Sequence, residues 1–289
     1  MEFRKILVPV TGAKQDQAAL AMAFAAAKPF NAHVEALFVH PDPREAVPYV
    51  GMPVSPEVIQ QIVDSAEEIA HKASKAAHAT LEKSTAHAGA KLVEHPMTGA
   101  GFVTACYREV NGHFITRVGE AAKLADLVVF GPATLDSGPD ISGAFVETLT
   151  HVQRPVLLAG EGAAHVLTKK IVIGYDRSVA ASHAISAALP FLTRAQEVEL
   201  IAVEDTPLDT RSLDDAVEYL ALHGVSARSH IISRGERSAA EALLDAAAKG
   251  GASLLVIGGY GHSRVLESLF GGTTLHLTRH RAMPLFMVH

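Results

Sequence analysis

Short apolar runs alternate with longer helical stretches along the whole chain. Residues 4–10 (RKILVPV) join two basic positions to an apolar run, and an alanine-rich helical pattern follows a small polar turn. Several runs are continuously apolar rather than alternating, which is typical of strands buried on both faces of a parallel sheet. Strands that alternate with helices predict a doubly wound α/β fold.

The alternation occurs twice. Residues 4–10 resemble residues 169–175 (KKIVIGY), and each run leads through a short polar turn into an alanine-rich stretch. Near the ends of the two halves, residues 125–131 (ADLVVFG) parallel residues 252–258 (ASLLVIG). A repeat on this scale indicates two copies of one folding unit.

The chain divides at residues 160–167 (GEGAAHVL), which are small and weakly patterned, as in a linker. We predict domains at 1–160 and 168–289, each with five strands that alternate with helices. Each closing strand enters through a proline, Pro155 or Pro284, at a position where a strand tolerates proline.

The two predicted domains differ between their second and third strands. The first carries a proline-rich loop at 41–56 and then a helical stretch from 57 to about 87, where the second has only residues 209–223. The loop is unusually apolar over 47–54. Packing on its own domain is the simpler explanation, and a pocket cover or a partner contact is the alternative.

Composition excludes several classes of protein. The 289 residues are 48% hydrophobic and 19% charged, as in an ordinary soluble globular protein. A net charge of -6 offers no positive field for nucleic acid or anionic lipid, and no apolar run reaches the ~20 residues of a membrane span. The N-terminal residues lack a signal-peptide pattern, and the single cysteine fits a reducing compartment. We therefore expect a cytoplasmic protein without nucleic-acid or membrane partners.

In an open parallel sheet, ligands bind beyond the carboxyl ends of the strands, where helix N-termini favour anions. In the second domain this edge is expected to collect residues from three strands. They are Gly174, Tyr175 and Asp176 after the first strand, Val203 on the second, and Gly258 at the end of the fourth. Asp176 also suits a plain helix N-cap.

Residues 258–274 (GGYGHSRVLESLFGGTT) follow the fourth strand of the second domain. A glycine pair followed by threonines at a helix start offers backbone N–H groups and hydroxyls to an oxyanion. Neither a Walker A loop nor a Rossmann fingerprint is present, and the glycine spacing alone fits turns and helix packing equally well. The residues of this stretch that we include in the candidate site are Gly258, Gly261, His262, Gly271, Gly272, Thr273 and Thr274.

This stretch resembles the ATP-binding signature of the universal stress protein family, G-x2-G-x9-G followed by Ser or Thr. Here Gly272 stands in the usual Ser/Thr position, with Thr273 behind it, and Asp176 and the closing PLFMVH fit the same family. The resemblance covers essentially the whole chain as two tandem repeats. It implies a five-stranded parallel sheet of order 3-2-1-4-5 in each, with helices on both faces, and pairing of the repeats through their last strands as an intrachain pseudo-dimer.

The resemblance also implies a site for ATP or a related adenine nucleotide in the second repeat, with or without Mg²⁺. Adenine would contact Gly174, Tyr175, Asp176 and Val203. Ribose and phosphates would lie against Gly258, Gly261, Gly271, Gly272, Thr273 and Thr274. His262 lies inside the loop and is either a phosphate contact or a solvent-exposed side chain.

The first repeat departs from this pattern. Thr11 or Gly12 stands where the second repeat has Asp176, and Pro132 and Thr134 follow Gly131 where a second glycine is expected. Proline removes a backbone donor, which harms a phosphate-binding loop. We predict that this repeat does not bind ATP in the family manner, and that it either binds another ligand or serves as a structural partner.

The pattern favours a nucleotide-dependent stress-response regulator over an efficient enzyme. No nucleophile–base arrangement can be singled out, and the sixteen histidines do not fall at zinc-ligand spacing. No catalytic or metal-binding residue is therefore predicted, and Cys106 is expected to be buried filler in a strand. The alternatives are a slow ATPase of the same fold, or a module whose first repeat binds a small apolar ligand or a protein. Assembly into a homodimer stays open.

Overall fold

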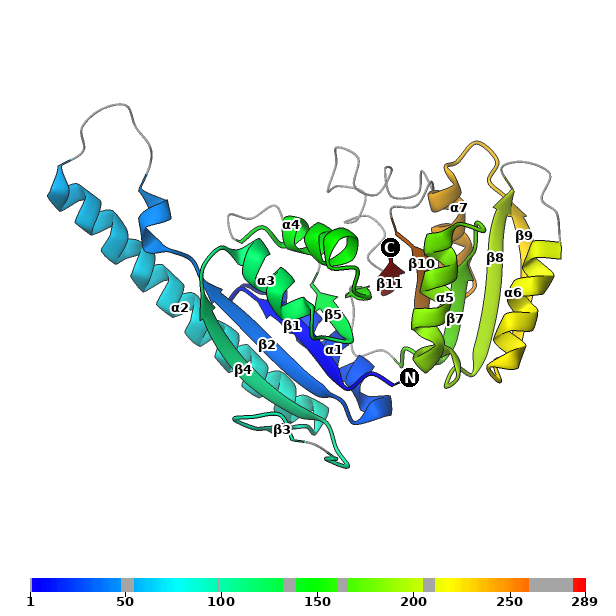
Figure 1. The fold of residues 1–289 in the computed structure, drawn as a ribbon, viewed down its shortest axis with the longest axis horizontal. Helices are drawn as coiled ribbons and strands as arrows, with labels where there is room; N and C mark the ends of the chain where they lie inside the picture. The colour runs from blue at the N-terminus through cyan, green and yellow to red at the C-terminus, as the bar shows by residue number, and fades with distance from the viewer. Residues whose placement is uncertain are drawn as a thin grey trace.

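The computed structural model describes residues 2–47, 55–97, 99–131, 139–160, 166–204, 211–259 and 283–289. Within these ranges the strands form one sheet of eleven, in the order β3-β4-β2-β1-β5-β6-β11-β10-β7-β8-β9 (Figure 1). The first half of the chain contributes β1 (Lys5–Val10), α1 (Asp16–Ala27), η1 (Lys28–Phe30), β2 (His33–His40), η2 (Pro43–Ala46), α2 (Pro56–Ala88), β3 (Lys91–Leu92), β4 (Thr104–Asn111), α3 (Phe114–Ala122), β5 (Leu127–Phe130), α4 (Ile141–Val146), η3 (Glu147–His151) and β6 (Val156–Leu158).

The second half repeats the alternation. It contributes β7 (Lys170–Gly174), α5 (Val179–Leu192), β8 (Glu197–Glu204), α6 (Arg211–Leu222), β9 (Ala227–Ser233), α7 (Ala239–Lys249), β10 (Leu254–Gly258) and β11 (Leu285–Val288). The order β9-β8-β7-β10-β11, all parallel, is the expected 3-2-1-4-5. The order β4-β2-β1-β5-β6 matches it in the first half, where the two-residue strand β3 extends the edge. The predicted tandem doubly wound fold is confirmed.

The two halves join through their last strands. β6 and β11 pair antiparallel, with Leu157 opposite Phe286. Beside this junction Phe191 of α5 contacts Phe3 at 5.0 Å and Phe30 at 5.6 Å between ring centroids. All four aromatic residues are buried, so apolar packing and strand pairing both hold the halves together.

Helices cover both faces of the sheet in each half. In the first half α1 and α2 pack on one face, where the buried cluster includes Val8 and Leu81, and α3 and α4 pack on the other, where it includes Leu7 and Phe145. The period-2 alternation of β1 explains this division, because successive side chains point to opposite faces.

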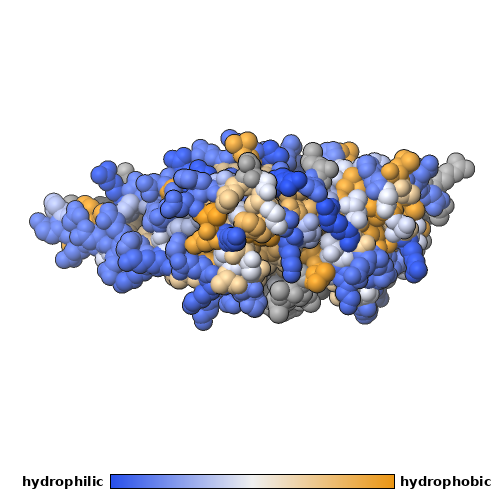
Figure 2. Space-filling model, turned by 90° about the horizontal axis from the view of Figure 1, so that it is seen from below, coloured by the Kyte–Doolittle hydropathy of each residue, from blue (hydrophilic) through white to orange (hydrophobic). Residues whose placement is uncertain are grey.

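Helix α2 is the long helix expected after the proline-rich loop. It begins at Pro56, where the Ser55 side chain accepts a hydrogen bond from the Val58 N–H, and it ends at Gly89 in the left-handed conformation. Its first turns extend beyond the sheet (Figure 1), and that end of the molecule is mostly hydrophilic when seen from below (Figure 2). Across the described ranges, no helix has the length and apolar character that crossing a membrane requires.

Candidate functional site

The carboxyl ends of β7, β8, β10 and β11 lie side by side in the second half. Gly174 is paired with Ile201, and Gly258 with Val288. Past these pairs the Tyr175 N–H donates to the Ile201 carbonyl at 2.9 Å. Residues that are far apart in the sequence therefore form one edge, where the fold class places ligands.

Gly258 brings the end of β10 directly against the start of α5. A Cβ at this position would lie 2.5 Å from the Ala181 nitrogen and 2.6 Å from the Ala180 carbonyl carbon, so no side chain fits. The first half repeats the device, because a Cβ on Gly131 would lie 2.9 Å from the Gln15 carbonyl oxygen. Helix packing thus requires a glycine here independently of any ligand.

Asp176 lies in the turn between β7 and α5. Its exposed carboxylate accepts a hydrogen bond from the Ser178 N–H at 3.0 Å, and Arg177 between them is left-handed, with φ 65°. Asp176 suits a helix N-cap, but the N-cap of α5 is Ser178, whose side chain accepts from the Ala181 N–H at 3.1 Å.

Val203 lies next to last in β8 and is half-buried. It packs against the cluster that includes Leu243 and Leu244 of α7. Helix α7 itself starts at a capping box, in which Ser238 and Glu241 satisfy each other's backbone N–H groups. The start of α5, in contrast, lies directly against Gly258, through Ala180 and Ala181.

Two histidines at this edge carry no signal in the sequence. The Nδ1 atom of His289 lies 2.9 Å from the Gly259 carbonyl oxygen, and the His183 Nδ1 lies 3.2 Å from the His289 carbonyl oxygen. The Gly259 N–H also donates to the Val288 carbonyl at 2.6 Å. Because these contacts join β10, β11 and α5, only the tertiary structure brings the histidines to the site.

Six of the predicted site residues lie outside the described residues: Gly261, His262, Gly271, Gly272, Thr273 and Thr274. The structure does bring together Gly174, Tyr175, Asp176, Val203 and Gly258. The residues expected to meet adenine are therefore described, together with Gly258, while the other residues expected at the ribose and phosphates lie outside the described ranges.

The model of the universal stress protein family matches residues 2–97 and 168–289. The chain belongs to this family. A universal stress protein from Archaeoglobus fulgidus DSM 4304 is 16% identical, with 99% of this chain and 96% of that chain covered and a TM-score of 0.63. A universal stress protein from Pseudomonas aeruginosa UCBPP-PA14, described as putative, is 16% identical over 99% of this chain and 93% of its own, with a TM-score of 0.52.

A universal stress protein solved in complex with cAMP is 20% identical over 43% of this chain and 98% of its own, with a TM-score of 0.34. No curated protein matches the sequence. The two whole-length likenesses establish the fold that the halves of this universal stress protein share.

In the first half of this universal stress protein, the backbone groups at the corresponding strand end are already hydrogen-bonded within the chain. Asp16, only 2% exposed, turns its carboxylate back onto the end of β1 and accepts hydrogen bonds from the Gly12 N–H at 2.7 Å and from the Thr11 N–H and hydroxyl. Burial raises the pKa of the Asp16 carboxyl to about 6, although these hydrogen bonds act to lower it. The backbone groups at this strand end are thus satisfied internally.

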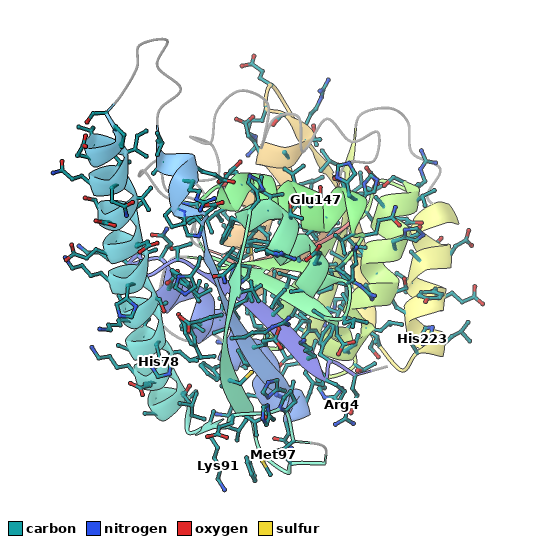
Figure 3. The ribbon with its side chains drawn as sticks, turned by 60° about the vertical axis from the view of Figure 1, so that its left-hand side comes forward. Arg4, His78, Lys91, Met97, Glu147 and His223 are labelled. Carbon is teal, nitrogen blue, oxygen red and sulfur yellow. The ribbon has the colours of Figure 1, made fainter. Side chains whose placement is uncertain are left out.

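Helix α2 covers the same place. Gly12 has φ 82° and lies so close to Ala73 of α2 that a Cβ would overlap its backbone. The next residue of α2, Ser74, bonds through its hydroxyl to the Tyr107 hydroxyl at 3.1 Å and to the Glu109 carboxylate. His78, one turn along α2 (Figure 3), stacks edge-on against Tyr107 with 4.9 Å between ring centroids. The long helix therefore occupies the space above the first strand end.

Other candidate chemistry is weak in the described part of the chain. It contains no group of three or more His, Cys, Asp or Glu side chains placed to hold a metal. Cys106 is buried, with its sulfur 3.2 Å from the His33 Nε2 atom, and burial raises the pKa of its thiol to about 11. Cys106 thus lies buried in β4, as expected, and burial disfavours the thiolate through which cysteines react.

Proposed function

We propose that the second half of this universal stress protein binds ATP or a related adenine nucleotide, and that the protein acts as a nucleotide-dependent regulator in a stress response. One observation carries the proposal: Asp176 follows β7, Gly258 ends the neighbouring, paired strand β10, and Gly258 lies against the start of α5. In the sequence, Gly258 comes directly before the glycine- and threonine-rich residues 259–274. The proposal extends to the domain bounds 1–160 and 168–289, because β6 ends at Leu158 and β7 begins at Lys170.

Each part of the nucleotide has a chemically suitable partner. The exposed Asp176 carboxylate is an acceptor for the adenine amino group, and the half-buried Tyr175 and Val203 offer apolar surface to the ring. The N-terminus of α5 favours phosphate, as do the hydroxyls and backbone N–H groups of a glycine–threonine loop. Mg²⁺ would accompany the phosphates through their own oxygens rather than through a dedicated protein cage.

The first half is proposed not to bind the nucleotide in this manner. Its strand-end N–H groups on Thr11 and Gly12 already donate to Asp16, and α2 lies over Gly12. A ligand there would have to displace both. We also infer a cytoplasmic location, which agrees with a buried, unpaired Cys106 thiol. If the protein forms a homodimer or binds another protein, we propose that nucleotide binding regulates that association.

Isothermal titration of the purified protein with ATP and Mg²⁺, after removal of co-purified ligand, tests the proposal. We expect one site per chain, weakened about tenfold or more in Asp176→Ala, because a carboxylate hydrogen bond to the base is lost. Asp64→Ala is the matched control, since Asp64 is an exposed aspartate on α2, far along the chain from this edge. A lack of binding at millimolar nucleotide, or equal affinities for the two variants, would count against the site.

A further inference from the structure

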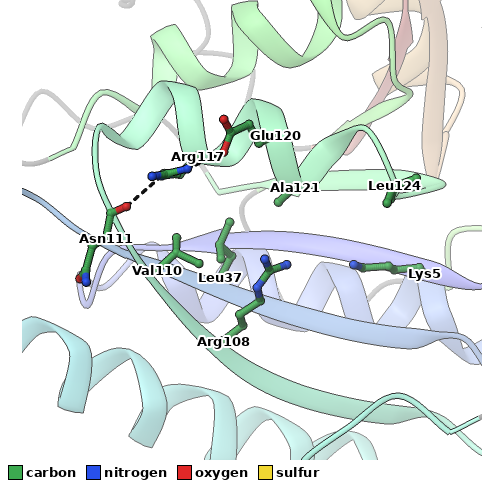
Figure 4. A pocket seen from close by; sticks show the side chains of 9 residues that line it. All are labelled: Lys5, Leu37, Arg108, Val110, Asn111, Arg117, Glu120, Ala121 and Leu124. Carbon is green, nitrogen blue, oxygen red and sulfur yellow. Dashed lines mark hydrogen bonds and ion pairs between the residues drawn. The ribbon is translucent and has the colours of Figure 1, made fainter.

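A cavity of about 520 Å³ lies between the sheet and α3 in the first half, away from the strand-end site (Figure 4). This volume is within the range of small-molecule sites. Its lining joins three cationic side chains to several apolar ones: Lys5, Leu37, Arg108, Val110, Asn111, Arg117, Glu120, Ala121 and Leu124.

The cavity exists because α3 covers only part of its face of the sheet. Helix α3 packs on β1 and β2, while the outer part of β4 remains uncovered, and Arg108 there is half exposed. On β4, Arg108 and Val110 alternate with Tyr107 and Glu109, which turn to α2 on the other face. The open strip beside α3 is therefore formed by Arg108 and Val110.

Two of the lining cations, Lys5 and Arg108, share one buried carboxylate behind the lining. Glu35 is 5% exposed, and its two oxygens lie 2.9 Å from the Lys5 Nζ atom and 3.2 Å from the Arg108 guanidinium. Figure 4 shows Lys5 and Arg108 extending toward one another above the sheet. Because one carboxylate neutralises only one of the two cations, Lys5, Arg108 and Glu35 together carry a net positive charge.

The opposite wall, on α3, adds an ion pair without net charge and an apolar side chain at the rim. Arg117 of α3 donates to the Glu120 carboxylate and to the Asn111 carbonyl, each at 2.8 Å. Leu124, just past the end of α3, is 82% exposed and borders the same space. The cavity thus combines excess positive charge with apolar surface from Val110 and Leu124.

The second half does not share this charge. By strand register, Lys170 corresponds to Lys5, Glu199 to Glu35 and His230 to Arg108. Lys170 there lies between two carboxylates, Glu197 at 3.2 Å and Glu199 at 3.0 Å, and the arginine is replaced by histidine. The positive excess is therefore a property of the first half and not a consequence of the fold.

We propose that this cavity binds a small organic anion with an apolar body, such as a medium-chain carboxylate. The carboxylate pairs with the Arg108 guanidinium, whose planar donors match two carboxylate oxygens. The hydrocarbon lies along Val110 and Leu124 and removes part of their apolar surface from water. The site is separate from the proposed nucleotide site, and neither proposal depends on the other.

Isothermal titration of the full chain with octanoate tests this site, with octylammonium as the probe of opposite charge. We expect saturable binding of octanoate at millimolar concentration and none of octylammonium. Leu124→Glu should weaken octanoate binding about tenfold or more through charge repulsion at the rim, whereas Leu124→Lys should retain it. Arg108→Met, which keeps the aliphatic stem, should abolish it.

Leu222→Glu is the matched control, because Leu222 is an 80% exposed leucine at the end of α6 and should leave octanoate affinity unchanged. Circular dichroism of each variant verifies the fold. The proposal is overturned if octanoate does not bind, if Leu124→Glu binds as the wild type does, or if saturating ATP with Mg²⁺ displaces octanoate competitively. Equal binding of octanoate and octylammonium would also overturn it, since the charge of the cavity would then play no part.

Discussion

Gly258 touches the backbone of Ala181 so closely that a methyl group on it would lie 2.5 Å from the Ala181 nitrogen. Gly258→Ala should therefore push α5 away from β10 and destabilise the fold by about 1–3 kcal/mol, because a closely packed backbone cannot yield as a side chain can. Urea unfolding followed by circular dichroism measures the loss.

Gly224→Ala provides a contrast to this substitution. Gly224 has open space around its Cβ position, so only its left-handed φ of 75° opposes the substitution. We expect a cost of about 1 kcal/mol there. If Gly258→Ala unfolds at the wild-type urea concentration, the contact that we describe does not constrain the helix.

Asp16 should make stability fall as the pH rises. The folded protein holds this proton up to about pH 6, while the unfolded chain releases it near the ordinary value of 3.8. Between these values the folded state binds more protons, so the stabilisation is full below about pH 4 and is lost as the pH passes 6. The difference amounts to about 3 kcal/mol at most.

Urea unfolding across pH 4 to 7 compares the wild type with Asp16→Asn, which should lack this part of the pH dependence. Other carboxylates contribute equally to both proteins and cancel in the difference. Asp176→Asn, at an exposed turn, should follow the wild-type curve. Parallel curves for wild type and Asp16→Asn would show that Asp16 is ionised throughout.

Phe191 should couple the two halves. It is fully buried and contacts Phe3, Phe30 and Phe286, which come from both halves of the chain. Phe191→Ala should cost about 3–5 kcal/mol and leave a cavity at the junction. Calorimetric unfolding should then separate into two transitions, whereas Phe145→Ala, buried within the first half, should lower stability without that separation. A single cooperative transition in Phe191→Ala would indicate that β6 and β11 pairing suffices.

Cys106 should resist thiol reagents in the native protein. Its pKa of about 11, raised by burial from 9.0, leaves about a hundredth of the thiolate that an ordinary cysteine has at pH 8. A 5% exposed side chain slows the reaction further. Reaction with a chromogenic disulfide should be slow until denaturant is added, and rapid stoichiometric labelling of native protein would contradict this assignment.

Much of the fold follows from local pattern. The apolar runs at 4–10 and 169–175 mark equivalent strands in the two halves, and the proline-rich loop followed by the helical stretch from 57 to about 87 marks α2. These features depend on alternation, capping and backbone conformation over a few residues, so they can be interpreted without knowing what packs on what.

Part of the candidate site also follows from the sequence. The doubly wound order places the strand ends that carry Gly174, Asp176 and Gly258 at one edge, as expected. The sequence does not reveal that Ser178 rather than Asp176 caps α5, because both residue types suit the position. The choice depends on the left-handed turn at Arg177.

The sequence by itself determined the repeat and the alternating elements, because period and spacing are local properties. The strand order and the nucleotide were implied by the family resemblance, and the edge that ligands would use followed from the fold class. Only the tertiary structure decided which partners meet across that framework. It placed Asp16 under α2, His183 beside His289, and Arg108 with Lys5 on Glu35. Such contacts join strands and helices that are distant along the chain, and their energies depend on burial and register, which no short stretch of sequence contains.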